Sequence, residues 1–306
     1  MPHLTKIVLA LALLAAAGMA AGRLCPPVRL FAMKAAGRSP VCPMDHALKA
    51  HENERLQEDY KDQILRASKL LEKDPAGYHL WDTPRGRWWI PQGDDFVLPF
   101  NLAEQQRLIY GIGEQMVKPG DVVLDCGANV GVFTRVALDR GARIVVAIEP
   151  APENLESLRR NFRQEIADGR VIVYPKGVWD KDDVLTLRRD PANTAADSFV
   201  ILKDKNESSI QVPLTTIDTL VAELKLDRVD YIKMDIEGAE TNALAGARAT
   251  LAKSHPRISV SSYHLPTDPQ RIPEVVRQAW PEVRMEVGPC AETPDGRVRP
   301  DVLYFR

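Results

Sequence analysis

A glycine loop between two apolar runs is the feature that most constrains the fold of this chain. The run Val122–Leu124 ends at Asp125, a loop opens at Gly127 and closes at Gly131, and a second apolar run ends at Glu149. This order predicts a strand, a loop, a helix and a second strand in a doubly wound α/β sheet, where glycines let a ligand approach the backbone. An acidic residue at the end of the second strand suits the two hydroxyl groups of a ribose.

The spacing of the loop glycines favours S-adenosylmethionine (SAM) over a dinucleotide. A dinucleotide fingerprint reads G-x-G-x-x-G, but here Asn129 stands in place of the middle glycine. The loop also begins with Asp125, which would repel a diphosphate and suits an ammonium group. The pattern D-x-G-A-N-x-G with a later acid resembles the SAM site of class I methyltransferases, although an ordinary strand-to-helix turn is the alternative. We expect the cofactor to contact Asp125, Gly127, Ala128, Asn129, Gly131 and Glu149, with Gly177 and Val178 near adenine.

Helical and strand patterns alternate after Glu149. Helices are predicted at 152–162, 240–251 and 270–279, and core strands at 171–174, 229–235, 258–262, 283–287 and 302–305. Short strands at 184–187, 199–202 and 210–214 indicate a β insertion. The predicted fold class is α/β, a doubly wound and mostly parallel seven-stranded sheet of the class I methyltransferase type, with an antiparallel last strand and an N-terminal helical extension.

Acidic residues and a histidine follow two neighbouring core strands. Alternation places Lys233 and Asp235 on one face of the strand that Asp235 ends, and Glu237 and Glu240 follow closely. His264 follows the next strand, at the same edge of the sheet. We expect Asp235, Glu237 and His264 to be catalytic, with His264 or Asp235 as the general base. The alternatives are that the two glutamates are ordinary helix N-terminal acids and that His264 is structural; a divalent cation between the three is left open.

The chain resembles the FkbM-type methyltransferase family over about 122–263, with a weaker tail to Arg306. The segments that carry the resemblance are Leu124–Gly131, Ile148–Asn154, Thr216–Leu220, Ile232–Glu240 and the pair Tyr263-His264 with Pro266. The resemblance implies SAM-dependent methyl transfer, usually to a hydroxyl group of a sugar, a polyketide or another small metabolite. It also implies that Pro150 and Asn154 belong to the cofactor site.

The composition limits the partners. A net charge of −2 argues against an extended nucleic-acid surface, and 45% apolar residues suffice for a core. No nucleic-acid partner is therefore expected, and the acceptor that the resemblance implies is a small molecule or a glycan. Two other functions are kept: a membrane-tethered SAM-binding module without catalysis, and a NAD-dependent dehydrogenase, against which the missing middle glycine counts. The sequence does not indicate an oligomeric state.

Three parts are expected along the chain: a hydrophobic segment at 1–24, a helical and tryptophan-rich extension at 25–100, and a Rossmann-like methyltransferase domain at 101–306. Residues 7–22 carry no charge and suit either a membrane anchor or a cleaved signal peptide. Basic residues after this run favour an anchor with the catalytic domain facing the cytoplasm. The alternative is a secreted or periplasmic protein, in which Cys25 and Cys42 could pair.

The extension itself has three predicted elements. Residues 46–74 are expected to form one amphipathic helix, and 81–91 a small hairpin or loop that turns at Pro84 and Gly86. Trp88 and Trp89 are expected to fill an outer apolar seam in preference to covering the active site. A helix at 101–116 leads into the first core strand.

Overall fold

A seven-stranded sheet organises the protein. The computed structural model describes residues 26–39, 41–190, 193–201, 208–293 and 296–306. The sheet has the strand order β12-β15-β11-β10-β4-β5-β6, and β15 runs antiparallel to both of its neighbours. The strands are β4 (Val122–Cys126), β5 (Ile144–Ile148), β6 (Val171–Tyr174), β10 (Tyr231–Met234), β11 (Arg257–Ser261), β12 (Met285–Val287) and β15 (Val302–Phe305). The doubly wound sheet with a final antiparallel strand is therefore confirmed.

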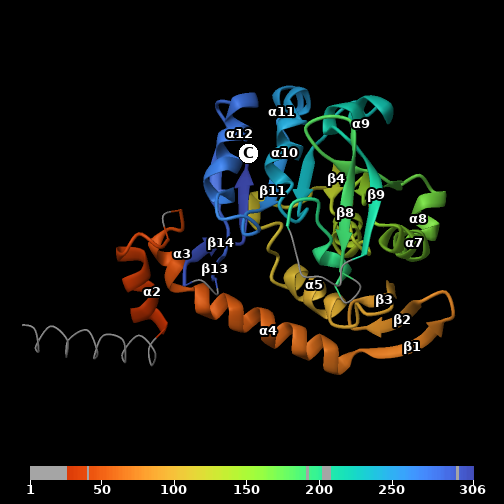
Figure 1. The fold of residues 1–306 in the computed structure, drawn as a ribbon, viewed down its shortest axis with the longest axis horizontal. Helices are drawn as coiled ribbons and strands as arrows, with labels where there is room; N and C mark the ends of the chain where they lie inside the picture. Colours follow the sequence, from red (N-terminus) through yellow and green to blue (C-terminus); the bar gives the residue numbers. More distant parts are fainter. Residues whose placement is uncertain (1–25, 40, 191–192, 202–207, 294–295) are drawn as a thin grey trace, which may run out of the picture.

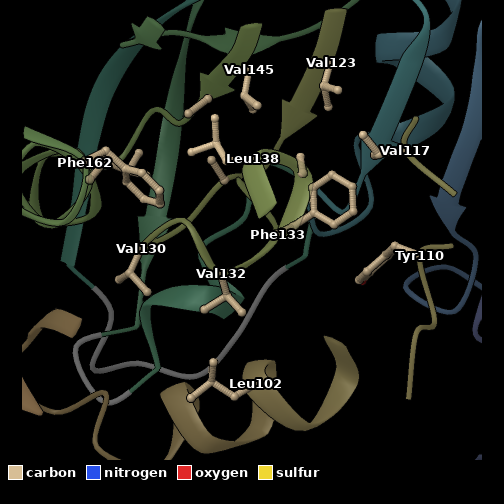
Figure 2. Close-up of a cluster of buried hydrophobic side chains, with 14 of the residues drawn as sticks. Leu102, Tyr110, Val117, Val123, Val130, Val132, Phe133, Leu138, Val145 and Phe162 are labelled. Atoms are coloured by element: carbon tan, nitrogen blue, oxygen red, sulfur yellow. The ribbon is translucent and has the colours of Figure 1, made fainter. Parts of the chain in front are cut away.

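Helices cover both faces of this sheet, which explains why its central strands are buried throughout. One face packs against α6 (Val132–Asp139), α7 (Pro152–Asn161) and α8 (Arg163–Ala167). Figure 2 shows part of this cluster, where Leu102 and Val132 lie on facing elements below the ring of Phe133. The other face packs against α9 (Ile217–Glu223), α10 (Glu240–Ala245), α11 (Arg248–Ser254) and α12 (Asp268–Ala279).

The prediction of a single helix at 240–251 is wrong in one respect: the structure has two helices there, α10 and α11. Gly246 and Ala247 lie between the two helices. A Cβ on Gly246 would lie 2.1 Å from the carbonyl oxygen of Trp179, so the backbone here packs closely against the segment after β7. This tertiary contact is not visible in a helical pattern.

The N-terminal extension lies along one side of the α/β domain (Figure 1). Its elements are α2 (Pro26–Ala35), α3 (Met44–Leu48), α4 (Ala50–Ala67), β1 (Lys69–Asp74), β2 (Tyr78–Thr83), β3 (Gly86–Pro91) and α5 (Val97–Gln106), followed by a 3-10 turn at Gly113–Gln115. The long helix predicted at 46–74 is wrong at its end, because 69–74 pair with β2 as a strand. The helix predicted at 101–116 begins earlier and ends at Gln106, just before Leu108 takes a φ of 58°.

The predicted hairpin is confirmed, since β2 and β3 pair from Tyr78↔Pro91 to Thr83↔Gly86. Trp88 is buried and its ring lies edge-on to Phe162, 6.4 Å between centroids. The backbone of Trp89 exchanges hydrogen bonds with the side chain of Asn161. These contacts join the hairpin to α7, so the two tryptophans fill a seam between the extension and the α/β domain.

The β insertion forms a separate three-stranded sheet, with the order β7-β9-β8. Its strands are β7 (Gly177–Val178), β8 (Asp183–Arg189) and β9 (Ser208–Thr215). The strand predicted at 199–202 is wrong for 199–201, and Leu202 lies outside the described residues. Ser198 Oγ accepts hydrogen bonds from the backbone of Val200 and Ile201 and donates one to the carbonyl of Glu237, which turns the chain toward the main sheet.

A disulfide joins the two ends of the described chain. Cys42 bonds to Cys290, the first residue of a hairpin of β13 (Cys290–Glu292) and β14 (Val298–Pro300). Leu30, Ala47 and Val298 surround the bond in a small buried cluster. The Cys25–Cys42 pairing considered from the sequence is thus corrected, because Cys42 is engaged elsewhere; Cys25 lies outside the described residues.

No helix within the described ranges is long and apolar enough to cross a membrane. The uncharged run at 7–22, for which an anchor or signal peptide is expected, lies outside these ranges, so that expectation stays a prediction.

Candidate functional site

A cavity of about 250 Å³ opens at the carboxyl edge of the sheet, above the ends of β4, β5 and β10. The glycine loop and Glu149 lie at one part of its wall, and Asp235 and Glu237 at another. Helix α5 and the segment between β8 and β9 complete the wall. The residues these two elements contribute include Phe96, Val97, Phe100, Asn101, Glu104, Gln105, Asn193, Thr194, Asp197 and Phe199.

The glycine loop has the conformation that its two glycines permit. Gly127 has a φ of 76°, and a Cβ there would lie 1.9 Å from the carbonyl oxygen of Asp235. Gly131 has a φ of 97°, and a Cβ there would lie 2.1 Å from the ring of Phe162. Only glycine combines these torsion angles with such close approach. The loop backbone can therefore lie against both the cavity and the neighbouring strand end.

Glu149 is fixed at the end of β5 by the backbone on either side. Its Oε2 accepts a hydrogen bond from the amide of Asn129, and its Oε1 accepts one from Ala151, both at 2.9 Å. The side chain is 5% exposed. Burial raises the pKa of Glu149 to about 7, against the opposing effect of these two amides. The carboxyl group still has lone pairs directed to the cavity, which is what two ribose hydroxyls require.

Asp125 lies behind the loop, beneath the cavity. It is fully buried, accepts a hydrogen bond from Thr134 Oγ1 at 2.6 Å, and lies 3.5 Å from Lys233 Nζ. Lys233 also donates to the carbonyl of Gly127 at 2.8 Å. Burial raises the pKa of Asp125 even beside this cation. Among the described residues Asp125 does not line the cavity, so its contribution is to fix Lys233 and the loop.

Asp235 is an ionised carboxylate at the acidic end of the cavity. Burial raises its pKa, but the neighbouring cations Lys233 and His264 outweigh burial and hold the pKa below its usual value. Its Oδ2 accepts a hydrogen bond from Tyr110 at 2.8 Å. Glu104 of α5 lines the same part of the cavity. Burial, followed by the charge of Asp235, raises the pKa of Glu104 to about 8.

His264 lies beneath this acidic end. Its side chain is 3% exposed, and in the described part of the chain it is not a lining residue of the cavity. Its Nδ1 contacts Glu240 Oε1 at 2.8 Å, and its Nε2 lies 3.4 Å from Asp235 Oδ1 and 3.3 Å from Glu237 Oε1. Burial lowers the pKa of His264, but Glu240 and Glu237 outweigh it and hold the pKa well above the usual value. Both ring nitrogens lie against carboxylates, and the expectation that His264 is a general base stays a prediction.

A short segment of the β insertion closes the cavity next to Glu149. Thr194 donates through its hydroxyl group and its amide to Asp94, and it contacts Asn154 Oδ1 at 2.8 Å. The neighbouring atoms Asn129 Oδ1, Asn193 Oδ1 and Asp197 Oδ2 are buried without a hydrogen-bond partner within the described residues. Burial raises the pKa of Asp197 to about 8, so its carboxyl group can donate as well as accept a hydrogen bond. These three unpaired oxygens around one wall suit a ligand that presents several hydrogen-bonding groups.

The structure brings most of the predicted site together. Those that line the cavity are Gly127, Ala128, Asn129, Glu149, Pro150, Gly177, Val178, Asp235 and Glu237. Asp125, Gly131, Asn154 and His264 lie behind this wall, as far as the described residues show, and support it. Sequence reasoning missed Glu104, Tyr110 and the Asn193–Asp197 segment. Their only sequence signal was position: each lies on an element before or between the core strands, and no spacing links them to the glycine loop.

Comparison with known proteins agrees with this geometry. Residues 125–287, more than half of the chain, match the family model described as Methyltransferase FkbM domain. The 31-O-demethyl-FK506 methyltransferase FkbM of Streptomyces tacrolimicus is 27% identical over 157 residues, and the 2-O-methyltransferase NoeI of Sinorhizobium fredii is 30% identical over 155 residues. These matches cover 42% and 45% of this chain, and 60% and 61% of the two relatives.

Among solved structures, a methyltransferase FkbM from Methylobacillus flagellatus KT is similar with a TM-score of 0.46 and 18% identity, covering 83% of this chain and 59% of that one. The family model spans both the glycine loop and the acidic segment after β10. The chain therefore belongs to the FkbM methyltransferase domain family.

Proposed function

We propose that this protein transfers the methyl group of SAM to a hydroxyl group on a sugar, a glycan or another small metabolite. The observation that carries the proposal is the placement of Glu149: a buried carboxyl group, held by two backbone amides, facing a cavity whose other end is acidic. Glu149 suits the ribose, and the unpaired oxygens of Asn129, Asn193 and Asp197 suit the remaining hydrogen-bonding groups of adenosine. The sulfonium and ammonium groups of SAM then lie toward the carboxylates.

Methyl transfer needs the acceptor oxygen about 3 Å from the methyl carbon and in line with the carbon–sulfur bond. As the C–O bond forms, the C–S bond breaks and its electron pair remains on sulfur, which becomes a neutral thioether. The hydroxyl proton must leave to a base. Glu104 and Asp235 both line the acceptor half of the cavity. We assign the proton to Glu104, which lines this half of the cavity from α5, whereas Asp235 Oδ2 already accepts a hydrogen bond from Tyr110. The raised pKa of Glu104 agrees with this role, since a base is most effective when its pKa lies near the working pH.

The side chains around Glu104 support a hydroxylated acceptor. Phe100 and Asn101 lie about one turn before it on α5, Phe96 precedes the helix, and all three line the cavity. Aromatic rings pack on the apolar faces of a sugar ring, while amide and carboxyl groups bond to its hydroxyls. Helix α5 lies before the residues that the family model matches, so it is not part of the shared domain. We expect it to select the acceptor of this particular protein.

The test has two stages. Calorimetric titration with SAM, S-adenosylhomocysteine (SAH) and NAD should give heat with the first two alone; no response to either SAM or SAH would contradict the proposal, and a response to NAD would favour a dehydrogenase. Labelled SAM is then offered with glycans, lipids and small alcohols. Asp235→Asn should abolish transfer and leave the fold intact. Binding of SAM without transfer to any acceptor would favour the alternative of a non-catalytic SAM-binding module.

The compartment stays a prediction on which two arguments oppose each other. SAM is a cytoplasmic metabolite, which favours a catalytic domain tethered through residues 7–22 and facing the cytoplasm. The Cys42–Cys290 disulfide is typical of an oxidising compartment, which favours the secreted or periplasmic alternative. The oxidation state of this pair in intact cells distinguishes the two.

A further inference from the structure

Four ionisable side chains converge beneath the acidic end of the cavity. Asp235 and Glu237 follow β10, Glu240 begins α10, and His264 follows β11. His264 Nε2 lies 3.4 Å from Asp235 Oδ1 and 3.3 Å from Glu237 Oε1. Asp235, Glu240 and His264 each offer one ligand atom within 4.8 Å of the others. Lys233 is the other cation near Asp235, and it also faces Asp125, so the three carboxylates around the imidazole carry more negative charge than these cations balance.

Two of the atoms that face one another in this cluster make no hydrogen bond to any other group. Asp235 Oδ2 accepts from Tyr110, and Glu240 Oε1 accepts from the amide of Ile236. By contrast, Asp235 Oδ1 and His264 Nε2 are buried with no hydrogen-bond partner in any described segment. A buried polar atom without a partner is costly, so its presence in a well-packed site calls for a ligand.

The separations fit the edges of a coordination polyhedron. Oxygen and nitrogen ligands lie about 2.0–2.2 Å from a divalent transition-metal ion, so two of them stand roughly 3.0–3.4 Å apart at angles between octahedral and tetrahedral. The two distances from Nε2 fall within this range. On the other side of the ring, Nδ1 contacts Glu240 Oε1 at 2.8 Å. A carboxylate bonded to the far nitrogen is the usual way in which a metal-binding histidine is oriented.

We propose that Asp235 Oδ1, Glu237 Oε1 and His264 Nε2 bind one divalent transition-metal ion, and that Glu240 is the positioning residue for His264. One nitrogen and two oxygen ligands suit Mn²⁺ or Zn²⁺ better than an all-oxygen ion such as Ca²⁺. Asp235 and Glu237 line the cavity, so an ion held between them and His264 lies at the cavity wall. The ion takes the place of the proton on Nε2.

This inference deepens the proposed function, and its role at the site rests on that function. An acceptor hydroxyl bound at an open position of the ion would lose its proton more readily and would be held near the methyl group. The binding of the ion itself needs neither SAM nor an acceptor, and it is therefore tested separately.

The purified full-length chain, with its disulfide intact, is titrated with Mn²⁺ by calorimetry and by electron paramagnetic resonance. One ion per chain is expected. Asp235→Asn and His264→Asn should each weaken Mn²⁺ binding at least tenfold, and Glu240→Gln should weaken it less. The matched control is Glu274→Gln, an exposed carboxylate on α12 paired with Arg271, which should bind Mn²⁺ as the wild type does.

Electron spin-echo modulation on the bound Mn²⁺ gives a readout that a structural role for His264 would not produce. The wild type should show coupling to an imidazole nitrogen, and Glu274→Gln should retain it. If either ligand variant fails to fold, this signal from the wild type alone decides. The proposal is overturned by the absence of Mn²⁺ binding at millimolar concentration, by binding without nitrogen coupling, or by binding unchanged in a folded His264→Asn.

The outcomes also separate this proposal from the proposed function. SAH binding without Mn²⁺ binding overturns the metal site and leaves methyl transfer standing. Mn²⁺ binding without SAH or SAM binding supports the metal site and contradicts the methyltransferase.

Discussion

Glu149 should give the protein two opposite pH dependences. Its pKa is raised by burial from 4.5 to about 7, so the folded state holds a proton that the unfolded state has released between these values. The stability contributed by that proton is fully present below pH 4.5 and is lost as pH rises to 7, by at most about 3 kcal/mol. In the proposed function the ribose hydroxyls bind the ionised carboxylate, so SAH should bind about tenfold more weakly at pH 6 than at pH 8.

Calorimetry with SAH across pH 5.5–8.5 and urea unfolding at the same pH values measure both effects. Glu149→Gln carries no titrating group, so the SAH affinity of this variant should be weak and its dependence on pH around 7 should flatten. A wild type whose SAH affinity does not change between pH 6 and 8 would show that the ribose does not depend on this carboxylate.

Glu104 predicts a second pH dependence, on turnover. Its pKa of about 8 means that the carboxyl group is mostly protonated at pH 7 and becomes a base as pH rises. With SAM saturating, kcat should therefore increase nearly tenfold per pH unit below 8 and level off above it. Glu104→Gln should lower kcat by about 10²- to 10⁴-fold and leave SAH affinity unchanged. The rise of kcat with pH below 8 should also disappear in this variant. A variant that keeps the same pH profile would assign the base elsewhere.

The residues that could be predicted from the sequence are those whose role is local. Gly127 and Gly131 are needed for the torsion angles of one loop, and Glu149 ends the strand that follows it, so spacing identified all three. Glu104 reaches the site from α5, and Tyr110 reaches it from the turn after that helix, where its hydroxyl group donates to Asp235. No spacing encodes such an approach, and neither residue could be predicted.

At the level of elements, the 193–197 segment should depend on one carboxylate of the extension. Asp94 is 1% exposed, and Thr194 donates to it through both its amide and its hydroxyl. Asp94→Ala leaves the buried amide of Thr194 unpaired, at a cost of about 1–3 kcal/mol, while the hydroxyl keeps only its contact with Asn154. We expect the segment to relieve this cost by moving away from the cavity. SAH should then bind about tenfold more weakly, and the segment should be cleaved faster by a protease.

The control for this variant is Asp227→Asn. The carboxylate of Asp227 is exposed and pairs with Arg143, and neither residue belongs to the 193–197 segment. It should match the wild type in both SAH affinity and proteolysis. An Asp94→Ala protein that binds SAH normally would mean that the segment is held by contacts other than Asp94.

Elements were predicted well where one face is buried against the sheet, and poorly where two elements compete for the same residues. The core strands and α12 lie close to their expected ranges because their apolar residues face one core. The 69–74 segment has a composition typical of a helix, yet it forms the strand β1. It does so because pairing with β2 supplies hydrogen-bond partners for its backbone. Tertiary pairing of this kind overrides local preference and leaves no local signal.

Across the whole molecule, the extension and the C-terminal hairpin act as one unit. Helices α2, α3 and α4 contact β13 or β14. Figure 1 shows α2, α3, β13 and β14 together at one end of the molecule, from which α4 runs toward β1. Arg29 pairs with Glu292, and Asn53 donates to the carbonyl of Cys290 at 2.9 Å. The Cys42–Cys290 bond closes a loop across a sequence separation of 248. The extension is therefore bound, covalently and by packing, to the β13–β14 hairpin, which follows α12.

Removing this bond should destabilise the folded protein more than it disturbs the cavity. Closing a loop of this length stabilises the folded state by about 5 kcal/mol in the chain-entropy description. The double variant Cys42→Ala, Cys290→Ala should lose up to that amount in urea unfolding, and SAH should still bind. Dithiothreitol should destabilise the wild type by a similar amount and leave the double variant unchanged. If reduction has no effect on unfolding, the packing of α2 and α3 suffices without the bond.

The redox state of the Cys42–Cys290 pair in intact cells indicates which compartment the protein occupies. Cys126 is fully buried and its thiol has a pKa raised by burial, so it reacts slowly with alkylating reagents while the protein is folded. Acid quenching followed by alkylation under denaturing conditions should label Cys126 and leave Cys42 and Cys290 blocked until reductant is added. A blocked pair indicates that the domain faces an oxidising compartment. Labelling of Cys42 and Cys290 without reductant would instead indicate a reduced pair, and with it a catalytic domain that faces the cytoplasm.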